Sequence, residues 1–294
     1  MANLKAIRIR ISSVRSTRQI TSAMKMVSAA KLRKAQDRIL QLRPYANKLY
    51  EILVDLYRSL DESELSNIYS RMTPPEKILI VVITSNRGLC GAFNSNVIRE
   101  VKNVISERYS GQFRKGNLWL MAIGKKGFDY FRKLKVQMVQ EHNHLFNELT
   151  FENVTAVAEQ VLKSFLSGEF DRVEIIYNQF KNAAVQNLTK EVFLPVEISQ
   201  KRKSDKAPVD YIYEPTKEEI IRELIPKSLK TQFYKAVLDS FVAEHGARMT
   251  AMHKATDNAT TMIRELTLQY NKARQAAITG QILEVTSGAE ALKG

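Results

Sequence analysis

The chain has few of the residues on which small secreted or loop-rich proteins depend. Its 294 residues include one cysteine, seven prolines and eleven glycines. The lone cysteine, Cys90, excludes an internal disulfide framework and fits a reducing compartment. Because proline and glycine break helices and both are scarce, the composition favours long helices over loops.

Long apolar runs are missing as well. No stretch approaches the roughly 20 continuous apolar residues that a membrane-spanning helix requires. The first ten residues, MANLKAIRIR, lack the apolar run of a signal peptide. We therefore expect the chain to begin at or near Met1 and to remain in the compartment where it is made.

Positive charge is concentrated near the N-terminus. The whole chain carries a formal net charge of +14, and residues 1–43 hold eleven Lys or Arg against one acidic residue, Asp37. Such a one-sided segment indicates an acidic partner: nucleic acid, anionic lipid or an acidic protein surface. The alternative is a helix face that serves only solubility.

Residues 1–60 are expected to form one nearly uninterrupted helix. Apolar residues recur at steps of 3 and 4 from Leu4 to Val14 and, after a change of phase, from Ala35 to Leu60, which is coiled-coil spacing. The residues that continue the stripe between these runs are Ile20, Met24, Val27 and Ala30. Pro44 is expected to kink or locally unwind the helix. At about 1.5 Å per residue the helix is on the order of 85–90 Å long, too long for the interior of a compact domain.

Residues 211–294 show a second helical pattern. Thr216 and Glu219 form a capping box that opens a short helix, and Pro226 is expected to interrupt it and to start the next one. The helix that follows carries a stripe made mostly of small residues: Ala236, Ala243, Ala247, Ala251, Ala255, Ala259, Met262, Leu266, Ala273 and Ala277.

Small side chains at helical spacing let a partner helix approach closely. Isolated single helices of this length would be unstable in water, and the N-terminal helix is the simplest partner. We therefore predict that the two ends of the chain pair as an antiparallel coiled coil. The alternative is two helices folded over an ordinary bundle core, which the many charges along the first helix disfavour.

Residues 61–210 show alternating strands and helices. The run Ile78–Ile83 is a buried strand by its continuous β-branched residues. Further strands are expected at 118–123, 136–139, 173–177 and 185–195, the last two as a hairpin, and helices at 95–109 (capped by Asn94), 125–133 and 151–166. A charged linker is expected at 200–206. The predicted fold class is α/β with a long antiparallel coiled coil: residues 1–60 and 211–294 form a shaft, and 61–210 a small Rossmann-like α/β domain.

The loop Thr84–Asn94 follows a strand and opens a helix, where an α/β domain would bind phosphate. Its spacing matches neither G-x-G-x-x-G nor the P-loop, so a structural or docking loop is favoured. A packing role for Cys90 is favoured over a nucleophilic one, because no base is identifiable nearby. His142 and His144 alternate like metal ligands but lack a third ligand, and His245 and His253 are assigned to a helix face. We predict no catalytic residue, no cofactor and no metal site.

Three segments resemble a known family. The run from Ile7 to Asp37 is similar to the opening helix of the γ subunits of F-type ATP synthases, and the run from Glu244 to Leu292 to their closing helix. The loop SNRGLCGAFN resembles their S-D-R-G-L-C-G element, with Asn86 where aspartate is usual. The matches cover both ends and an interior anchor, in the right order.

The resemblance implies a non-catalytic rotor shaft, with the nucleotide sites on other subunits. The implied partners are the α and β subunits of the hexameric head, the ε subunit and the membrane ring of c subunits, with no nucleic acid and no small-molecule substrate. The implied location is the cytoplasmic side of a bacterial plasma (inner) membrane, as a peripheral protein.

The resemblance also assigns contact residues. The basic residues expected to face acidic surfaces of the head are Arg8, Lys25, Lys31, Arg33 and Lys34. The residues that match family contacts to a β subunit are Arg87, Arg248, Arg274, Gln275 and Thr279, and Met24 matches a methionine near the β lever segment. Gly280 replaces a usual glutamine and Gly246 a usual alanine, each lowering helix propensity by up to about 1 kcal/mol.

Two other functions are compatible with parts of the pattern. A nucleic-acid-binding coiled-coil protein would explain the basic N-terminal helix, and would bind with steep salt dependence. An α/β enzyme using the Cys90 loop would turn over a substrate and lose that activity in Cys90→Ser. The rotor assignment predicts no ATPase activity of the isolated chain.

Overall fold

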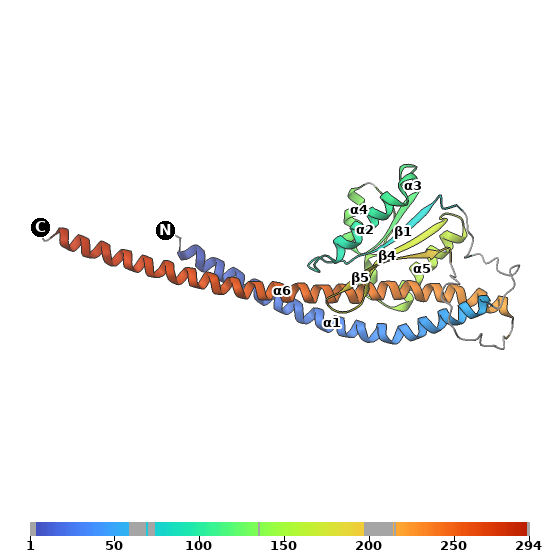
Figure 1. Ribbon diagram of the computed structural model, residues 1–294, viewed down its shortest axis with the longest axis horizontal. Coiled ribbons are helices and arrows are strands. Elements are labelled where there is room, and N and C mark those ends of the chain that lie inside the picture. Colours follow the sequence, from blue (N-terminus) through green and yellow to red (C-terminus); the bar gives the residue numbers. More distant parts are fainter. Residues whose placement is uncertain are drawn as a thin grey trace. The chain divides into compact units, whose positions relative to one another are not determined.

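A computed structural model describes residues 4–58, 69, 74–134, 136–196, 214 and 216–292. The chain divides into two units: Met1–Ser28 with Met249–Gly294, and Ala29–Arg248. We call the first the terminal unit and the second the α/β unit. Two long helices, α1 (Leu4–Arg58) and α6 (Lys217–Ala291), contribute to both units (Figure 1).

The α/β unit contains a five-stranded sheet. Its elements are β1 (Ile78–Ile83), α2 (Phe93–Glu107), α3 (Ser110–Arg114), β2 (Leu118–Ile123), α4 (Lys125–Lys133), β3 (Gln137–Glu141), the 3₁₀ turn η2 (Asn143–Phe146), α5 (Phe151–Leu166), β4 (Arg172–Phe180) and β5 (Gln186–Leu194). The strand order is β3-β2-β1-β4-β5, with β1 to β4 parallel and β5 antiparallel to β4. The predicted alternation and the predicted β4–β5 hairpin are confirmed, and α4 and α5 have the predicted bounds.

The core of the α/β unit lies on both faces of this sheet. All six residues of β1 are buried, as a continuous β-branched run between two helix layers requires. On one face α2 supplies Val97 and Val101, which join the cluster around β1. On the other face α6 packs against β5, where the rings of Phe193 and Phe233 lie 5.6 Å apart.

The seam of α1 follows one heptad repeat along its described length. The seam residues, all buried or partly buried, are Leu4, Ile7, Ile11, Val14, Arg18, Thr21, Lys25, Ser28, Leu32, Ala35, Ile39, Leu42, Ala46, Leu49 and Leu53. The predicted change of phase is therefore wrong. Ile20 and Val27, predicted on the stripe, are 60% and 57% exposed, and Ala30 is exposed too.

Small polar residues occupy the seam where apolar ones were expected. The Thr21 hydroxyl donates to the Arg18 carbonyl oxygen and the Ser28 hydroxyl to the Met24 carbonyl oxygen, both within α1. A hydroxyl bonded to its own helix can be buried at little cost. Apolarity alone therefore misplaces the seam between residues 18 and 28.

Neither internal proline ends its helix. Pro44 lies within α1, and Pro226 lies within α6, so the predicted interruption at Pro226 is wrong. The buried side chains of Ile225 and Leu229 flank Pro226, and their packing offsets the single backbone bond that proline removes. The predicted cap is confirmed, because the Glu219 amide donates to the Thr216 hydroxyl at 3.3 Å. Leu60 and the predicted linker at 200–206 lie outside the described residues.

An ion pair between the partly exposed Arg43 and the buried Asp239 joins α1 and α6, and Arg43 also reaches the β4–β5 hairpin. Arg43 donates to the Asp239 carboxylate at 3.0 Å and to the Phe180 carbonyl oxygen at 3.1 Å. The Asp239 side chain is 0% exposed, and its Oδ2 has no partner among the described residues. Burial raises the pKa of Asp239, and Arg43 opposes that rise.

Replacing Arg43 should destabilise the protein in a pH-dependent way. Arg43→Ala leaves a buried carboxylate without its cation, which should cost about 3 kcal/mol at pH 7. With its folded-state pKa above the unfolded value, Asp239 takes up a proton in the folded protein as pH falls, so the loss should shrink toward acid pH. Urea unfolding of both proteins from pH 7.5 to 4.5 measures this difference. Lys48→Ala, which removes an exposed pair with Glu51, is the control and should cost under about 1 kcal/mol; a pH-independent loss in Arg43→Ala would contradict the account.

Candidate interaction site

The loop Thr84–Asn94 leaves β1 at the carboxyl end of the parallel strands and is held by side-chain hydrogen bonds. The Ser85 amide donates to the Asn94 side-chain oxygen at 2.9 Å, and the Asn94 amide group donates to the Ser85 hydroxyl at 2.8 Å. Asn94 therefore closes the loop and does not cap α2, which begins one residue earlier, at Phe93, without a side-chain cap. The predicted cap is wrong because the side chain finds a better partner in the loop.

Asn86 fits its position as an amide. Its side-chain oxygen accepts from the Lys125 backbone amide at 3.0 Å, and its side-chain nitrogen donates to the Asn143 carbonyl oxygen at 2.8 Å. An aspartate could accept the first bond but could not donate the second. Asn86 therefore joins the loop to the turns after β2 and β3.

Arg248 of α6 holds the backbone of the same loop. Its guanidinium donates to the Glu244 carboxylate at 2.5 Å, to the Arg87 carbonyl oxygen at 2.9 Å and to the Gly88 carbonyl oxygen at 3.3 Å. Burial raises the pKa of Glu244, and Arg248 opposes that rise. Arg248 is only 8% exposed, whereas the Arg87 side chain is exposed, so Arg248 positions the loop and Arg87 is presented outward.

Leu89 marks the tip of this surface. Its backbone has φ of 64°, a left-handed conformation that is uncommon for a leucine, and its side chain is 64% exposed. A large apolar side chain held outward by a strained backbone favours contact with another molecule. Apart from its place in the motif, nothing in the sequence marks Leu89.

Cys90 lies beneath the loop and is not an activated thiol. Its side chain is 1% exposed, and the Asn94 amide group donates to its sulfur at 3.3 Å. Burial raises the pKa of the thiol, so the neutral form dominates at neutral pH. The predicted packing role is confirmed.

The four histidines occupy different environments. Within the described residues there is no group of three or more His, Cys, Asp or Glu side chains suited to a metal ion. His142 is buried, and burial lowers its pKa. His245 is buried rather than on an exposed helix face, its ring packs edge-on against Phe241, and burial lowers its pKa to about 3. His253 is exposed on α6, as expected.

The structure explains the glycine at position 246 but not the one at position 280. A Cβ atom at position 246 would lie 3.2 Å from the Ala183 carbonyl oxygen, tighter than most real contacts. The glycine therefore lets α6 approach the turn between β4 and β5. A Cβ atom at position 280 would meet nothing within 4 Å, and nothing in the structure explains that glycine.

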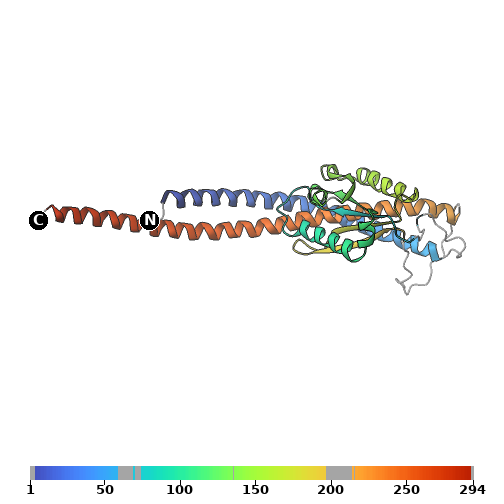
Figure 2. The same ribbon diagram turned by 90° about the horizontal axis from the view of Figure 1, so that it is seen from above.

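In the terminal unit the two helices pair in antiparallel register. Arg8 donates to the Tyr270 hydroxyl at 2.8 Å, and the Thr256 hydroxyl donates to the Thr21 hydroxyl at 2.9 Å. The Lys25 ammonium lies 3.4 Å from the His253 Nδ1 atom. As the residue number rises along α1 the partner number falls along α6, which confirms the predicted pairing (Figure 2).

The terminal unit exposes many large apolar side chains. The exposed set on α1 is Ile9, Ile20, Met26 and Val27, and on α6 Met262, Leu268, Ile278, Ile282, Leu283 and Val285. Ile20 and Val27 were predicted on the N-terminal stripe and Met262 on the C-terminal stripe, and the sequence assigned none of the others to a partner surface. These residues can be recognised as a separate exposed set only once the heptad register shows which positions face the partner helix. Arrays of exposed apolar residues mark interaction surfaces.

The end of α6 has no helix beside it within the described residues. The register that joins Arg8 to Tyr270 places the first described residue, Leu4, near residue 274, and α6 continues to Ala291 (Figures 1 and 2). Arg274, Gln275 and Thr279 are exposed there. A lone helix of this length is marginal in water, so this segment indicates a surface completed by a partner.

The predicted basic contacts are distributed between the units. Arg8 and Lys25 already have partners on α6, and Met24 is partly buried. Lys31, Arg33 and Lys34 are exposed in the α/β unit, and none makes an ion pair with another described residue. The structure thus brings Arg87 and Arg248 together, and it places Arg274, Gln275 and Thr279 on one stretch of α6.

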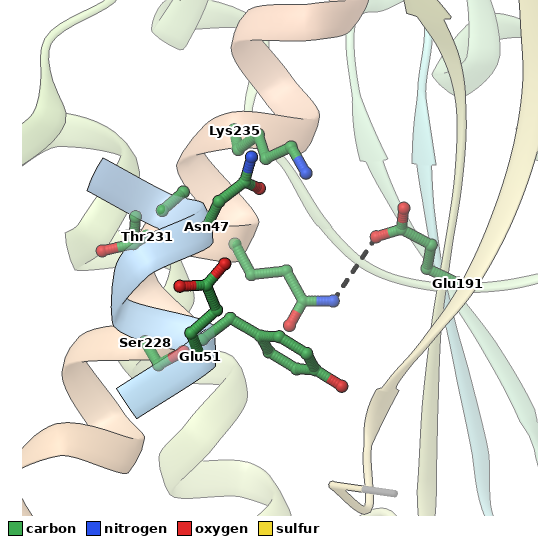
Figure 3. A pocket seen from close by; sticks show the side chains of 9 residues that line it. Asn47, Glu51, Glu191, Ser228, Thr231 and Lys235 are labelled. Atoms are coloured by element: carbon green, nitrogen blue, oxygen red, sulfur yellow. Dashed lines mark hydrogen bonds between the residues drawn. The ribbon is translucent and has the colours of Figure 1, made fainter. Parts of the chain in front are cut away.

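A polar cavity of about 620 Å³ lies between α1, β5 and α6 in the α/β unit (Figure 3). Gln232 donates to Glu191 across it at 3.4 Å, and Glu191 also accepts from the Tyr177 hydroxyl. The Thr231 hydroxyl donates to its own helix at Lys227. The polar groups of Gln232 and Glu191 therefore satisfy each other. Nothing in the sequence predicted this cavity.

Comparisons with known proteins give the family. The family model described as ATP synthase matches residues 3–292. The ATP synthase gamma chain of Flavobacterium johnsoniae is 58% identical over 294 residues, with 100% of both chains covered, and that of Cytophaga hutchinsonii is 50% identical, with 99% of both covered. The chain belongs to the ATP synthase gamma chain family.

Chains in solved ATP synthase structures share the fold. A chain from the Tetrahymena thermophila mitochondrial ATP synthase, central stalk and c-ring, matches with a TM-score of 0.57 at 26% identity, covering 80% of this chain and 99% of that one. A chain from the Euglena gracilis mitochondrial ATP synthase matches with a TM-score of 0.66 at 23% identity, covering 98% and 94%. As a member of the gamma chain family, the protein is a central-stalk rotor subunit and not a catalytic chain. No helix among the described residues is both long and apolar enough to cross a membrane.

Removing the Arg248 guanidinium should open the loop over Cys90. Arg248→Ala deletes the bonds to the Arg87 and Gly88 carbonyl oxygens and leaves Glu244 buried without its cation. A local loss of about 2 kcal/mol should raise the rate of Cys90 modification by a thiol reagent about 30-fold. Arg87→Ala is the matched control, because it removes an exposed side chain and keeps the carbonyl oxygen. Equal rates in the wild type and in Arg248→Ala would contradict the positioning role.

Proposed function

We propose that the chain transmits rotation from a membrane ring of c subunits to the catalytic β subunits, coupling ion flow to ATP synthesis. The observation that carries the proposal is the terminal unit: a paired antiparallel helix segment with exposed apolar side chains, and an end of α6 that has no partner helix among the described residues. A paired helix is stiff enough to carry torque, and its apolar exterior suits a surrounding protein sleeve.

The partners in this proposal are the α and β subunits of the head, the ε subunit and the c ring. Two matching structures are described as central stalk with c-ring and as OSCP/F1/c-ring, which supports this set. The proposed head contacts are Arg8, Met24, Lys25, Lys31, Arg33, Lys34, Arg87, Arg248, Arg274, Gln275 and Thr279. Arg248 acts in this set through the loop that it holds, and Arg87 and Leu89 make the contact itself.

We assign the shaft and the foot of the rotor to separate ranges of the chain. Residues 1–60 and 211–294 supply the shaft, and residues 61–210 supply the foot that meets ε and the ring. The proposed location is the cytoplasmic side of a bacterial plasma (inner) membrane, held peripherally through these partners. The high identity to bacterial gamma chains supports this location.

Reconstitution tests the proposal. The full chain alone should hydrolyse no ATP, and mixing it with α and β subunits from Flavobacterium johnsoniae should give a complex whose ATP hydrolysis turns a bead attached to the α/β unit. A chain that ends at Arg274 lacks the unpaired end of α6 and should assemble with at least tenfold lower yield or turn with lower torque.

The truncated chain should still fold, because its α/β unit is intact. Its urea unfolding transition and its Cys90 protection should match those of the full chain, which separates a partner defect from misfolding. Failure of the full chain to join α and β, or tight nucleotide binding by the chain alone, would reject the proposed function.

A further inference from the structure

A second hollow lies on the α/β unit, away from the Thr84–Asn94 loop. Its volume is about 450 Å³, and it is lined by the C-terminal half of α2, by α3, by the end of α4 and by Val136 just before β3. These segments lie at the amino end of the parallel strands, whereas Thr84–Asn94 lies at the carboxyl end. The hollow is therefore separate from the loop proposed to meet the head.

The floor and the mouth of this hollow are apolar. Phe131 and Val136 are buried at 1% and 8% exposure and form part of its lining. At the mouth, Phe113 and Leu134 are 43% and 48% exposed. Two large apolar side chains exposed beside a hollow of this size favour binding of an apolar ligand group.

The rim of the hollow is basic. Lys102 and Arg114 belong to its lining, and neither makes an ion pair or a side-chain hydrogen bond with another residue in the described ranges. Residues 99–135 contain ten Lys or Arg and only three acidic residues. An apolar floor under uncompensated positive charge matches a ligand with one apolar tail and one anionic head.

We propose that this hollow binds a single-chain anionic amphiphile, of the class of a long-chain fatty acid anion. The tail packs on Ile105, Phe131 and Leu134, and the carboxylate lies between Lys102 and Arg114, where Ser110 supplies a hydroxyl donor. A volume of about 450 Å³ falls in the lower part of the range for small-molecule sites. That size fits one alkyl chain, and the charge complementarity selects an anionic head over a neutral or cationic one.

Calorimetric titration of the full chain with dodecanoate, below its micelle concentration, tests the proposal. Dodecanoate should bind one to one, and affinity should rise about fourfold for each CH₂ from octanoate to dodecanoate while the added group is fully buried. Dodecyl maltoside and dodecyltrimethylammonium, which have the same tail with a neutral or cationic head, should bind at least tenfold more weakly.

Variants locate the site. The double variant Lys102→Glu with Arg114→Glu reverses the charge of the rim and should weaken dodecanoate binding about tenfold or more. Leu134→Asp places a charge at the apolar mouth and should weaken binding by a similar factor. The Leu134 side chain is half exposed, so folding does not depend on it. Lys163→Glu, an exposed lysine of α5 outside the hollow, is the matched control and should bind like the wild type. Melting temperatures of the free variants verify that each is folded.

Three results would overturn the proposal. Equal affinity for dodecanoate and dodecyl maltoside would show that the basic rim does not recognise the anionic head group. Equal weakening in Lys163→Glu would show that only overall charge matters. Binding to anionic phosphatidylglycerol vesicles without binding of monomeric dodecanoate would assign the basic patch to a membrane surface instead of a single-chain ligand.

Discussion

The structure depends on the packing of α1 against α6. Neither helix has enough apolar surface of its own to persist alone in water, and each supplies the seam for the other. In the terminal unit this pairing is the whole structure. In the α/β unit the same two helices also pack on the sheet, so that the seam there is part of a larger core.

Polar groups fix the register of that seam more sharply than its apolar ones do. Alanines and leucines at heptad spacing tolerate a slip of one repeat, whereas Arg43 reaches Asp239 and Thr21 reaches Thr256 in one register only. Burying Asp239 and Glu244 raises the free energy of their ionised forms, and each is held by one arginine. Of these two ion pairs, only Arg43–Asp239 joins the two helices, because Glu244 and Arg248 both lie on α6. The Arg43–Asp239 pair therefore contributes specificity of alignment more than net stability.

The sequence predicted the parts of the fold where one local signal dominates. The β-branched run of β1, the bounds of α4 and α5 and the antiparallel pairing of the chain ends all follow from period and composition. It failed where tertiary context decides. Thr21 and Ser28 lie on the seam because their hydroxyls bond within α1, Pro226 stays helical because its neighbours are buried, and Asn94 turns to Ser85 instead of capping α2.

The candidate site, like the fold, could be predicted from the sequence only in part. The motif identified Arg87 and Arg248 as contact residues, but only the structure shows their different roles: Arg87 is presented outward, and Arg248 is buried beneath the loop. Three exposed apolar residues of the terminal unit, Ile20, Val27 and Met262, were predicted on the seam, because a helix period does not state which of two apolar stripes faces the partner helix. The hollow between α2, α3 and α4 has no sequence signal, since its lining comes from four separate segments.

Disulfide trapping tests the register of α1 on α6 most directly. The hydroxyl oxygens of Thr21 and Thr256 lie 2.9 Å apart. In a Cys90→Ser background, the double variant Thr21→Cys with Thr256→Cys should therefore cross-link readily under mild oxidation. Cysteines at positions 21 and 260, one turn further along α6, should cross-link at least tenfold more slowly. Equal cross-linking of both pairs, or faster cross-linking of 21 with 260, would contradict the heptad register on which this account rests.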